Sequence, residues 1–314
     1  MALRIVFCGT PAFAVPSLQH LIAQPDFEVS GVVTQPDRPR GRGREVHSSP
    51  VKDAAAAAGI PVYQPEKIKS DGGYDYFKRL APDAVVIIAY GQIISQRLID
   101  IPRLGWINVH GSLLPKYRGA APINWAIVNG EARTGLTTMR IDAGLDTGPM
   151  LLEYETEIGA DETAPELTAR LADAAAPLIA ETLRKLDRGE IVPTPQDKSL
   201  ASLAPPLKKE DGRIDWSSNA QKIYNRIRGL QPWPCAFTTF RGKNCQIWGK
   251  PLKPVSAGGA PGVILPTQED GLLVICGGPT VLRVEQIQLE GRGRVTDREF
   301  MNGARIVPGE RFGS

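Results

Sequence analysis

Residues 83–89 read Asp-Ala-Val-Val-Ile-Ile-Ala, a short apolar run that stops at Tyr90. Three further runs of this kind lie at residues 3–8, 27–34 and 105–109. Such uninterrupted runs are typical of strands buried on both faces of a parallel sheet. Between them lie a segment with helical spacing at residues 13–23 and a helix that starts at Ser49-Pro50 and stops at Gly59. Strands alternating with helices predict an α/β fold for the N-terminal part, a Rossmann-like open and mostly parallel sheet.

The C-terminal third has a different pattern. A long helix is expected over residues 164–186, and the Pro-rich segment after it has the composition of an exposed linker. One amphipathic helix over residues 217–230 is followed by short strands separated by Gly and Pro, at residues 235–240, 245–249, 262–265, 272–276 and 281–289. Five short strands in a basic segment predict a small OB-like β-barrel. The expected domains are residues 1–188 and 207–314, joined by a linker over 189–206.

Composition limits the classes of function. The 314 residues carry a net charge of only +3, but residues 207–314 hold 16 Lys and Arg against 10 Asp and Glu. A basic C-terminal part behind a slightly acidic larger part indicates a polyanionic partner or a solvated basic surface. No stretch approaches the ~20 apolar residues of a membrane helix, and the N-terminus lacks the features of a signal peptide. Four scattered cysteines without a CxxC pair argue against disulfides and a zinc site, so we expect a cytoplasmic protein without metal.

The run at residues 105–109 leads directly into the candidate site. In open α/β sheets, ligands bind beyond the carboxyl ends of the strands. Asn108 and His110 are two residues apart, so in a strand both side chains fall on one face. Asn supplies N–H donors for an oxyanion, and His can move a proton. A Gly- and Asp-rich loop at residues 141–148 offers Asp146, a carboxylate that can orient an imidazole and stabilise its charged form. Each residue alone is weak evidence, because Asn, His and Asp are also ordinary turn and surface residues.

Together, the sequence segments around Asn108, His110 and Asp146 resemble a known family signature. The stretch Asn-Val-His-Gly-Ser-Leu-Leu-Pro at 108–115, its continuation Lys-Tyr-Arg-Gly-Ala-Ala-Pro-Ile, and the loop at 142–148 are similar to those of the 10-formyltetrahydrofolate-dependent formyltransferases. The resemblance covers nearly the whole chain. It implies that Asn108, His110 and Asp146 are the catalytic trio, with no departure from the family pattern at these positions.

The resemblance also implies the site of the formyl donor. The residues that would line the folate site are Ser112, Leu113, Leu114 and Pro115, and the backbone of Tyr90, Gly91 and Gln92 would border the pterin pocket. 10-Formyltetrahydrofolate is then a co-substrate, and we expect no tightly bound cofactor.

The acceptor is indicated by a segment outside this core. Residues 34–44 read Thr-Gln-Pro-Asp-Arg-Pro-Arg-Gly-Arg-Gly-Arg, a loop without an apolar anchor that we expect to be mobile in the absence of a partner. Arginine binds phosphates bidentately and stacks on bases, although a solvated basic loop is equally compatible with the composition. The segment resembles the loop with which the members that formylate methionyl initiator tRNA contact the acceptor stem. It implies tRNA binding by Arg38, Arg40, Arg42 and Arg44, with Arg42 making the critical contact.

Two motifs in the C-terminal part distinguish less well between acceptor substrates. The segments Arg-Ile-Asp-Trp at 213–216 and Pro-Trp-Pro-Cys-Ala at 232–236 resemble the C-terminal domain of the same enzymes, but also that of relatives with other acceptors. The resemblance implies that residues 207–314 are an OB-like domain that binds tRNA. We expect Trp216 and Trp233 to be core anchors rather than surfaces for base stacking. The oligomeric state follows from none of these patterns, and a monomer is our expectation.

Three alternatives stay open at this point. A sugar-nucleotide N-formyltransferase would share the catalytic core, and a non-catalytic RNA-binding protein would share the barrel and the arginine loop. A dinucleotide-dependent oxidoreductase is disfavoured, because the turn after the first strand, Gly9-Thr10-Pro11, is not the GxGxxG of a pyrophosphate site.

Overall fold

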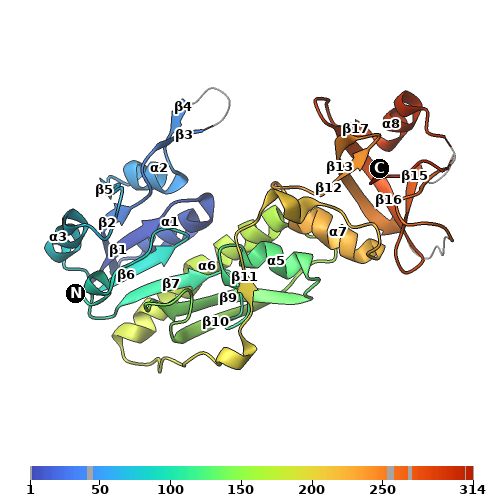
Figure 1. Ribbon diagram of the computed structural model, residues 1–314. Coiled ribbons are helices and arrows are strands. Elements are labelled where there is room, and N and C mark those ends of the chain that lie inside the picture. The colour runs from blue at the N-terminus through green and yellow to red at the C-terminus, as the bar shows by residue number, and fades with distance from the viewer. Residues whose placement is uncertain (1, 41–44, 253–257, 268–270, 308, 314) are drawn as a thin grey trace. The chain divides into compact units, whose positions relative to one another are not determined.

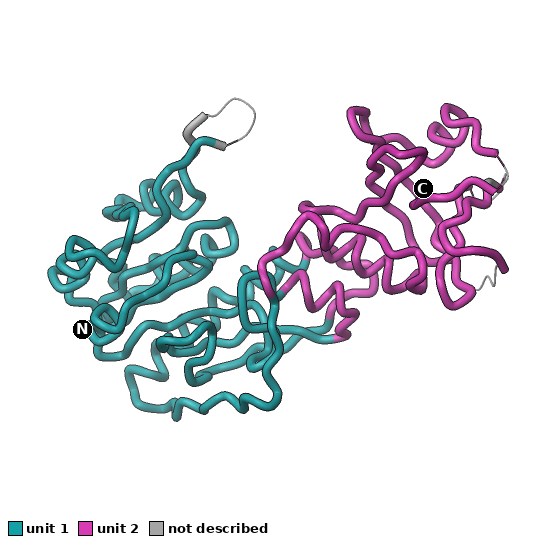
Figure 2. The backbone as a smooth tube through the Cα atoms, viewed as in Figure 1, with its two compact units in different colours: residues 1–122, 133–157, 167–204 teal, residues 123–132, 158–166, 205–314 magenta. Residues whose placement is uncertain are grey.

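The computed structural model describes residues 2–40, 45–252, 258–267, 271–307 and 309–313. The chain divides into two compact units (Figure 2). Unit 1 comprises residues 1–122, 133–157 and 167–204, and unit 2 comprises residues 123–132, 158–166 and 205–314. Two short segments from the middle of the chain, residues 123–132 and 158–166, therefore pack with the C-terminal part. The expected boundaries at residues 188 and 207 stay a prediction.

Unit 1 is built on a seven-stranded sheet with the order β10-β9-β7-β6-β1-β2-β5 (Figure 1). Its strands are β1 (Leu3–Gly9), β2 (Phe27–Val33), β5 (Val62–Tyr63), β6 (Ala84–Ile88), β7 (Trp106–His110), β9 (Arg133–Arg140) and β10 (Met150–Glu157). The five adjacent strands β7, β6, β1, β2 and β5 are parallel to one another. Strand β9 pairs antiparallel with both of its neighbours, β7 and β10. The predicted open, mostly parallel α/β sheet is confirmed.

Helices cover this sheet, and three of them agree with helices that the sequence predicts, at residues 13–23, from Ser49-Pro50 to Gly59, and at residues 164–186. They are η1 (Ala12–Ala14), α1 (Val15–Ala23), α2 (Pro50–Ala57), α3 (Asp71–Leu80), α4 (Gln96–Ile99) and α6 (Ala164–Asp187). Helix α5 (Pro122–Val128) belongs to unit 2 from its second residue onward. Ser49 caps α2, since its hydroxyl oxygen accepts the Lys52 N–H at 3.1 Å, and Pro50 is the first helical residue. Gly59, at φ 69°, follows the last turn, so both ends of this helix agree with the prediction.

The two faces of the unit 1 sheet bury different helices. Val6 and Cys8 of β1 share a cluster with Phe77 of α3 and Trp106 of β7, whose rings lie 5.0 Å apart. On β9, the Thr138 hydroxyl lies 3.0 Å from the hydroxyl of Thr182 in α6. Because side chains alternate along a strand, Trp106, Asn108 and His110 of β7 share the face that α3 covers.

Unit 1 also contains two small ladders. The first pairs β3 (Arg38–Arg40) with β4 (Glu45–His47), and the second pairs β8 (Arg118–Gly119) with β11 (Leu203–Ala204). The first lies in the arginine-rich segment that the sequence predicts to be a loop, so its base is an antiparallel hairpin instead. Local apolar patterning gave no sign of either ladder, since each strand has only two or three residues.

Unit 2 is an antiparallel half-barrel. Its sheet has the order β12-β13-β16-β15-β14, with β17 beside β16. The elements are η3 (Lys209–Gly212), α7 (Ala220–Gly229), β12 (Phe237–Phe240), β13 (Lys243–Leu252), β14 (Ile264–Pro266), β15 (Leu272–Cys276), β16 (Thr280–Leu289), β17 (Val295–Thr296) and α8 (Asp297–Ala304). Helix α7 buries Ile223 and Ile227 against the sheet, which confirms the predicted amphipathic helix and the OB-like class.

The two tryptophans of this unit behave differently. Trp216 is buried, stacks on Phe312 at 5.7 Å, and donates its indole N–H to the Thr238 hydroxyl. Trp233 is 55% exposed, so the prediction that it anchors the core is wrong. It stands between Pro232 and Pro234, and the Gln231–Pro232 and Trp233–Pro234 peptide bonds are both cis. An apolar residue type thus gave a false signal of burial in a segment of irregular backbone.

Three further observations bear on the class of protein. No helix within the described residues is both long and apolar enough to cross a membrane. In the same part of the chain, no group of three or more His, Cys, Asp or Glu side chains is arranged to hold a metal ion. The cysteines are free thiols; Cys8, Cys245 and Cys276 are buried, and burial raises the pKa of each thiol.

Candidate active site

The ends of the parallel strands converge at one edge of the unit 1 sheet. Thr10 follows β1, Gln35 follows β2, and Tyr90 follows β6. The Thr10 hydroxyl and the Gln35 side-chain amide both donate to the Tyr90 carbonyl, at 3.3 and 3.0 Å. These contacts tie three loops together at the carboxyl edge, where open α/β sheets bind their ligands.

Asn108 and His110 are held at the same edge by β7. That strand lies between β6 and β9, and Asn108 pairs with Ile87 on one side and Met139 on the other. Strands on both sides fix the backbone and so the direction of the two side chains. The Asn108 side-chain amide makes no hydrogen bond within the described residues, so its N–H groups remain available to a ligand.

The His110 ring is buried, with 5% of its surface exposed, and both of its nitrogens face oxygen atoms. Nε2 lies 2.8 Å from the Tyr117 carbonyl oxygen, and Nδ1 lies 3.7 Å from Oδ2 of Asp146. A carbonyl oxygen can only accept, so Nε2 carries a proton. In a neutral ring, Nδ1 would then turn its lone pair toward a carboxylate, whereas in a charged ring its N–H points there. The 3.7 Å separation leaves Nδ1 without a close hydrogen-bond partner, so this nitrogen can face a bound reactant.

Asp146 is positioned by unusual backbone. It has a φ of 51°, and Tyr117, which accepts from His110, has a φ of 61°. Left-handed backbone at a non-Gly residue costs about 1–2 kcal/mol and persists only where the surroundings impose it. Oδ2 of Asp146 also accepts the Gly119 N–H at 2.9 Å. The chain thus uses strained turns at two positions to bring a carboxylate and a carbonyl to one imidazole.

Gln196 connects this loop to the rest of unit 1, and sequence reasoning missed it. Its side-chain N–H groups donate to the carbonyls of Asp146 and Gly148, at 2.9 and 2.8 Å. Its side-chain oxygen accepts two hydrogen bonds from the Arg118 guanidinium, at 2.9 and 2.7 Å. Gln196 lies in the Pro-rich segment expected to be a linker, and no local pattern distinguishes a glutamine with these partners from one in solvent.

The segment after β7 is fastened from several sides. The Ser112 hydroxyl donates to the Lys116 carbonyl at 2.6 Å, and the Leu114 N–H donates to the Thr137 hydroxyl at 3.0 Å. Ser112 and Leu114 are buried, whereas Leu113 and Pro115 are half-buried. Of the four residues expected to line the folate site, Leu113 and Pro115 present side chains at a surface. Ser112 and Leu114 would act through their backbone.

The segment at residues 90–92 is a second wall of this edge. The Tyr90 side chain is buried, and Gly91 has a φ of 87°, which favours glycine. The Gln92 side-chain oxygen accepts the Ile68 N–H at 2.7 Å, and its amide donates to the Pro65 carbonyl at 3.1 Å. The Gln92 side chain is therefore already hydrogen-bonded to the loop before α3, whereas the backbone at Gly91 is exposed and accessible to a ligand.

Two of the predicted tRNA-binding arginines, Arg38 and Arg40, lie on β3 of the small antiparallel ladder. Arg38 is exposed, and Arg40 ends β3. Arg42 and Arg44 lie outside the described residues. The base of the hairpin is anchored through Asp37, which pairs with Lys52 of α2 and accepts from Gln64 at 2.8 Å. The Lys52 and Gln64 contacts lower the pKa of the Asp37 carboxyl.

A search of family models agrees with the geometry. Residues 3–183 match the formyl transferase family, and residues 206–305 match the formyl transferase C-terminal domain. The two matches cover most of the chain. The chain belongs to the formyl transferase family, as the resemblance of residues 108–115 predicts.

Full-length relatives narrow the assignment within that family. The chain is 54% identical to a methionyl-tRNA formyltransferase of Solibacter usitatus, over 99% of both chains. It is 52% identical to a methionyl-tRNA formyltransferase of Koribacter versatilis, over 98% of both chains. Among solved structures, a sugar 3N-formyltransferase crystallised with dTDP and 5-N-formyl-THF superposes with a TM-score of 0.67 at 18% identity, covering 93% of this chain and all of that one. That similarity concerns the fold.

Proposed function

We propose that this chain transfers the formyl group of 10-formyltetrahydrofolate to the α-amino group of methionyl initiator tRNA. The observation that carries the proposal is the buried His110 beside Asp146, at the end of the strand that holds Asn108. The full-length similarity to methionyl-tRNA formyltransferases supplies the acceptor.

Asn108, His110 and Asp146 form the proposed catalytic trio. The attacking amine adds to the formyl carbon, and the carbonyl oxygen becomes an oxyanion. Asn108 offers its unengaged amide N–H groups, and His110 offers Nδ1–H while Nε2 stays on the Tyr117 carbonyl. Donors fixed before the reaction stabilise the developing charge without reorganisation. Asp146 compensates the positive ring in a site that excludes most water.

The bonds and protons of this step balance. The bond from the methionyl nitrogen to the formyl carbon forms, and the bond from the formyl carbon to N10 of the folate breaks. The amine loses one proton, which the Asp146 carboxylate would accept directly or through water, and the same proton then passes to N10 as the folate leaves, so the enzyme ends in its starting state. The products are N-formylmethionyl-tRNA and tetrahydrofolate. The reaction needs neither an oxidant nor a metal.

The donor site would lie along the carboxyl edge. Leu113 and Pro115 present partly exposed side chains, Ser112 and Leu114 contribute backbone, and the backbone of Tyr90, Gly91 and Gln92 borders the pterin. In this proposal the folate is a co-substrate that leaves after each turnover, and no cofactor is tightly bound.

The tRNA would be contacted by the arginine hairpin. Arg38 and Arg40 lie on its strand, and Arg42 and Arg44 complete the basic segment. Guanidinium groups on an exposed hairpin suit the phosphates of an acceptor stem. We further propose that the protein acts in the cytoplasm, as a monomer.

A sugar-nucleotide N-formyltransferase is the competing enzyme, and a catalytically inactive RNA-binding protein is the competing class. The test uses formyl-labelled folate with charged initiator tRNA, uncharged tRNA and a dTDP-linked amino sugar. Label should enter the charged tRNA alone. Label in the amino sugar, or tRNA binding without any transfer of label, would refute the proposal.

A further inference from the structure

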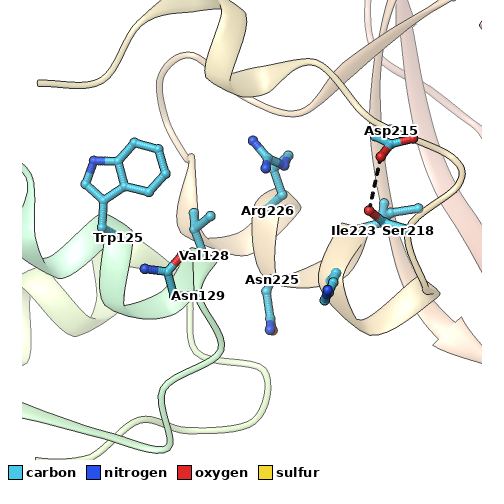
Figure 3. Close-up of a pocket in the computed structure, with 9 residues that line it drawn as sticks. Trp125, Val128, Asn129, Asp215, Ser218, Ile223, Asn225 and Arg226 are labelled. Atoms are coloured by element: carbon cyan, nitrogen blue, oxygen red, sulfur yellow. Dashed lines mark hydrogen bonds between the residues drawn. The ribbon is translucent and has the colours of Figure 1, made fainter. Parts of the chain in front are cut away.

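Unit 2 contains a pocket that the catalytic proposal does not use. Its volume is about 540 Å³, within the range of roughly 300–1,000 Å³ usual for sites that bind small molecules. Figure 3 shows Trp125, Val128 and Asn129 on one side, and side chains of α7 and of the segment before it on the other. Residues 123–132 belong to unit 2, so this pocket lies within one compact unit.

One wall of the pocket is an indole ring. Trp125 is half-buried, and its ring N–H donates to the Pro205 carbonyl at 2.8 Å. That hydrogen bond limits rotation of the ring, while the remaining exposed surface borders the pocket. A fixed, partly exposed aromatic face is a surface on which a nucleobase can stack.

The opposite wall carries two cations. Lys222 is exposed and its ammonium has no partner within the described residues. The Arg226 guanidinium donates to the Asp211 carbonyl, which orients the group. Among the residues that the structure describes, Asp215 is the one carboxylate that lines the pocket. It accepts hydrogen bonds from Ser217 and Ser218, and these contacts lower the pKa of its carboxyl. The pocket therefore carries a net positive charge.

Asn225 adds a directional donor. It is 93% buried, and its side-chain oxygen accepts from Gln221 and Arg228, at 3.1 Å each. Its amide nitrogen makes no hydrogen bond within the described residues, and a methyl group at Gly130 would lie 2.8 Å from it. The lack of a side chain at Gly130 thus leaves space beside a buried N–H donor in the pocket wall.

We propose that this pocket binds one nucleotide of the tRNA, with its base on the Trp125 ring and its phosphate beside Lys222 and Arg226. The inference rests on the proposed function, which makes tRNA the substrate. An aromatic face, two cations and the amide donor of Asn225 match a base, a phosphate and a ribose.

The charge of the C-terminal part favours tRNA over a free nucleotide. Residues 207–314 hold six more basic than acidic residues, and the pocket cation Lys222 is exposed. A free nucleotide would gain only the local contacts, whereas a polyanion also gains from the surrounding charge.

The test compares two pairs of variants by their KM for charged initiator tRNA and for the formyl donor. Trp125→Leu should raise the KM for tRNA about tenfold, while Trp125→Phe should stay within about twofold, because it keeps an aromatic face. Lys222→Gln should raise that KM about threefold and reduce the slope of log KM against log salt by about one. Lys243→Gln, at an exposed lysine that does not line the pocket, is its matched control. The KM for the donor should be unchanged throughout.

Equal tRNA KM values for Trp125→Leu and Trp125→Phe, or a salt slope of Lys222→Gln equal to that of Lys243→Gln, would overturn the pocket proposal. The proposal would also be overturned if adenosine monophosphate bound tightly while neither Trp125→Leu nor Lys222→Gln changed the KM for tRNA. The pocket would then bind a free nucleotide. Failure of the unmodified protein to formylate charged tRNA is a separate result, and it would refute the proposed function instead.

Discussion

The proposed catalytic edge of unit 1 and the pocket of unit 2 hold charged side chains in opposite ways. In unit 1, His110 is 5% exposed, and its partner Asp146 has 14% of its side chain exposed. In unit 2, Lys222 is exposed and Arg226 is half-buried. A reaction needs charges at fixed positions in a low dielectric, whereas binding a polyanion needs only that cations be near it. Changes at the first region should therefore lower turnover, and changes at exposed cations should alter affinity in a salt-dependent way.

The largest effect is expected at the catalytic trio. Asn108→Ala removes an unengaged donor, and His110→Ala removes the buried ring, so each should lower kcat by at least about 10²-fold. Single-turnover formylation with saturating tRNA and donor measures the chemical step. His20→Ala, at a half-buried histidine of α1, is the control and should retain full activity.

If Asn108→Ala and His110→Ala fold normally and keep kcat within a few-fold, the first region is not a reaction centre, and the contrast between the two regions disappears. Thermal unfolding separates loss of chemistry from loss of structure in both variants.

Gln196 provides a sharper test of the same region, because its side chain contacts Asp146, Gly148 and Arg118 and would affect the reaction through them. We propose that it is a positioning residue. Gln196→Ala removes every contact, whereas Gln196→Glu keeps an acceptor for Arg118 but places a carboxylate against the carbonyls of Asp146 and Gly148. Both should lower kcat about tenfold to a hundredfold, with the KM for tRNA unchanged, as supporting residues of an active site do.

A purely structural role for Gln196 makes a different forecast. The melting temperature would fall, and kcat for each folded molecule would stay at its normal value. Gln96→Ala is the matched control, because the Gln96 amide contacts Asp100 on the surface.

Gln196 also shows where prediction from the sequence reaches its limit. Four strands of the parallel sheet, the caps of α2 and the shared face of Asn108 and His110 follow from local patterns, because burial and hydrogen bonding act over a few residues there. The contact of Gln196 with Asp146 joins residues 50 positions apart through a glutamine whose neighbours read as solvent-exposed. Its position depends on how the chain folds back, and residue type does not encode that.

Backbone conformation was likewise outside the reach of pattern reasoning. The positive φ of Tyr117 and Asp146 orients the Tyr117 carbonyl and the Asp146 carboxylate toward His110. The residue types Tyr and Asp do not by themselves predict a left-handed backbone conformation. Trp233 is the converse case, because its apolar type predicted burial and the local chain instead leaves it exposed. Resemblance to a family supplied the identity of Asp146, and coordinates supplied its 3.7 Å distance to the ring.

Substitutions in the arginine hairpin should behave like those at the exposed cations of the unit 2 pocket. They should raise the KM for tRNA moderately, by an amount that depends on the salt concentration. Arg42→Ala should raise the KM for tRNA about tenfold, because a phosphate or base loses its guanidinium, with little change in the KM for the donor. Arg38→Ala should act in the same direction more weakly. Repeating both at higher salt should reduce the difference from the unmodified protein. Equal losses for tRNA and donor would indicate a damaged fold or another role for the hairpin.

The smallest effect is expected at Asp161, a charge that stabilises unit 2 without serving either site. Its side chain accepts from the Tyr224 hydroxyl at 2.6 Å and from the Lys250 ammonium at 3.0 Å, and these two contacts lower its pKa. A carboxyl whose pKa is lower in the folded state stabilises the fold above its unfolded pKa. That contribution is lost as the pH falls through the folded value. Because the side chain is 65% exposed, Asp161→Asn should cost less than about 1 kcal/mol at pH 7.

Urea unfolding of Asp161→Asn and the unmodified protein at pH 7 and pH 3 measures this contribution. The midpoints should differ slightly at pH 7 and come closer together at pH 3, because the stabilisation by the Asp161 carboxylate decreases once the pH falls below the pKa of the unfolded state. Asp75→Asn, at an exposed residue of α3, should show neither effect. A difference that persists at pH 3 would mean that the hydrogen bond to Tyr224, and not the charge, supplies the stability. Unit 2 would then use a buried polar contact in the way that unit 1 does, and the distinction between the two regions would apply to their functional sites alone.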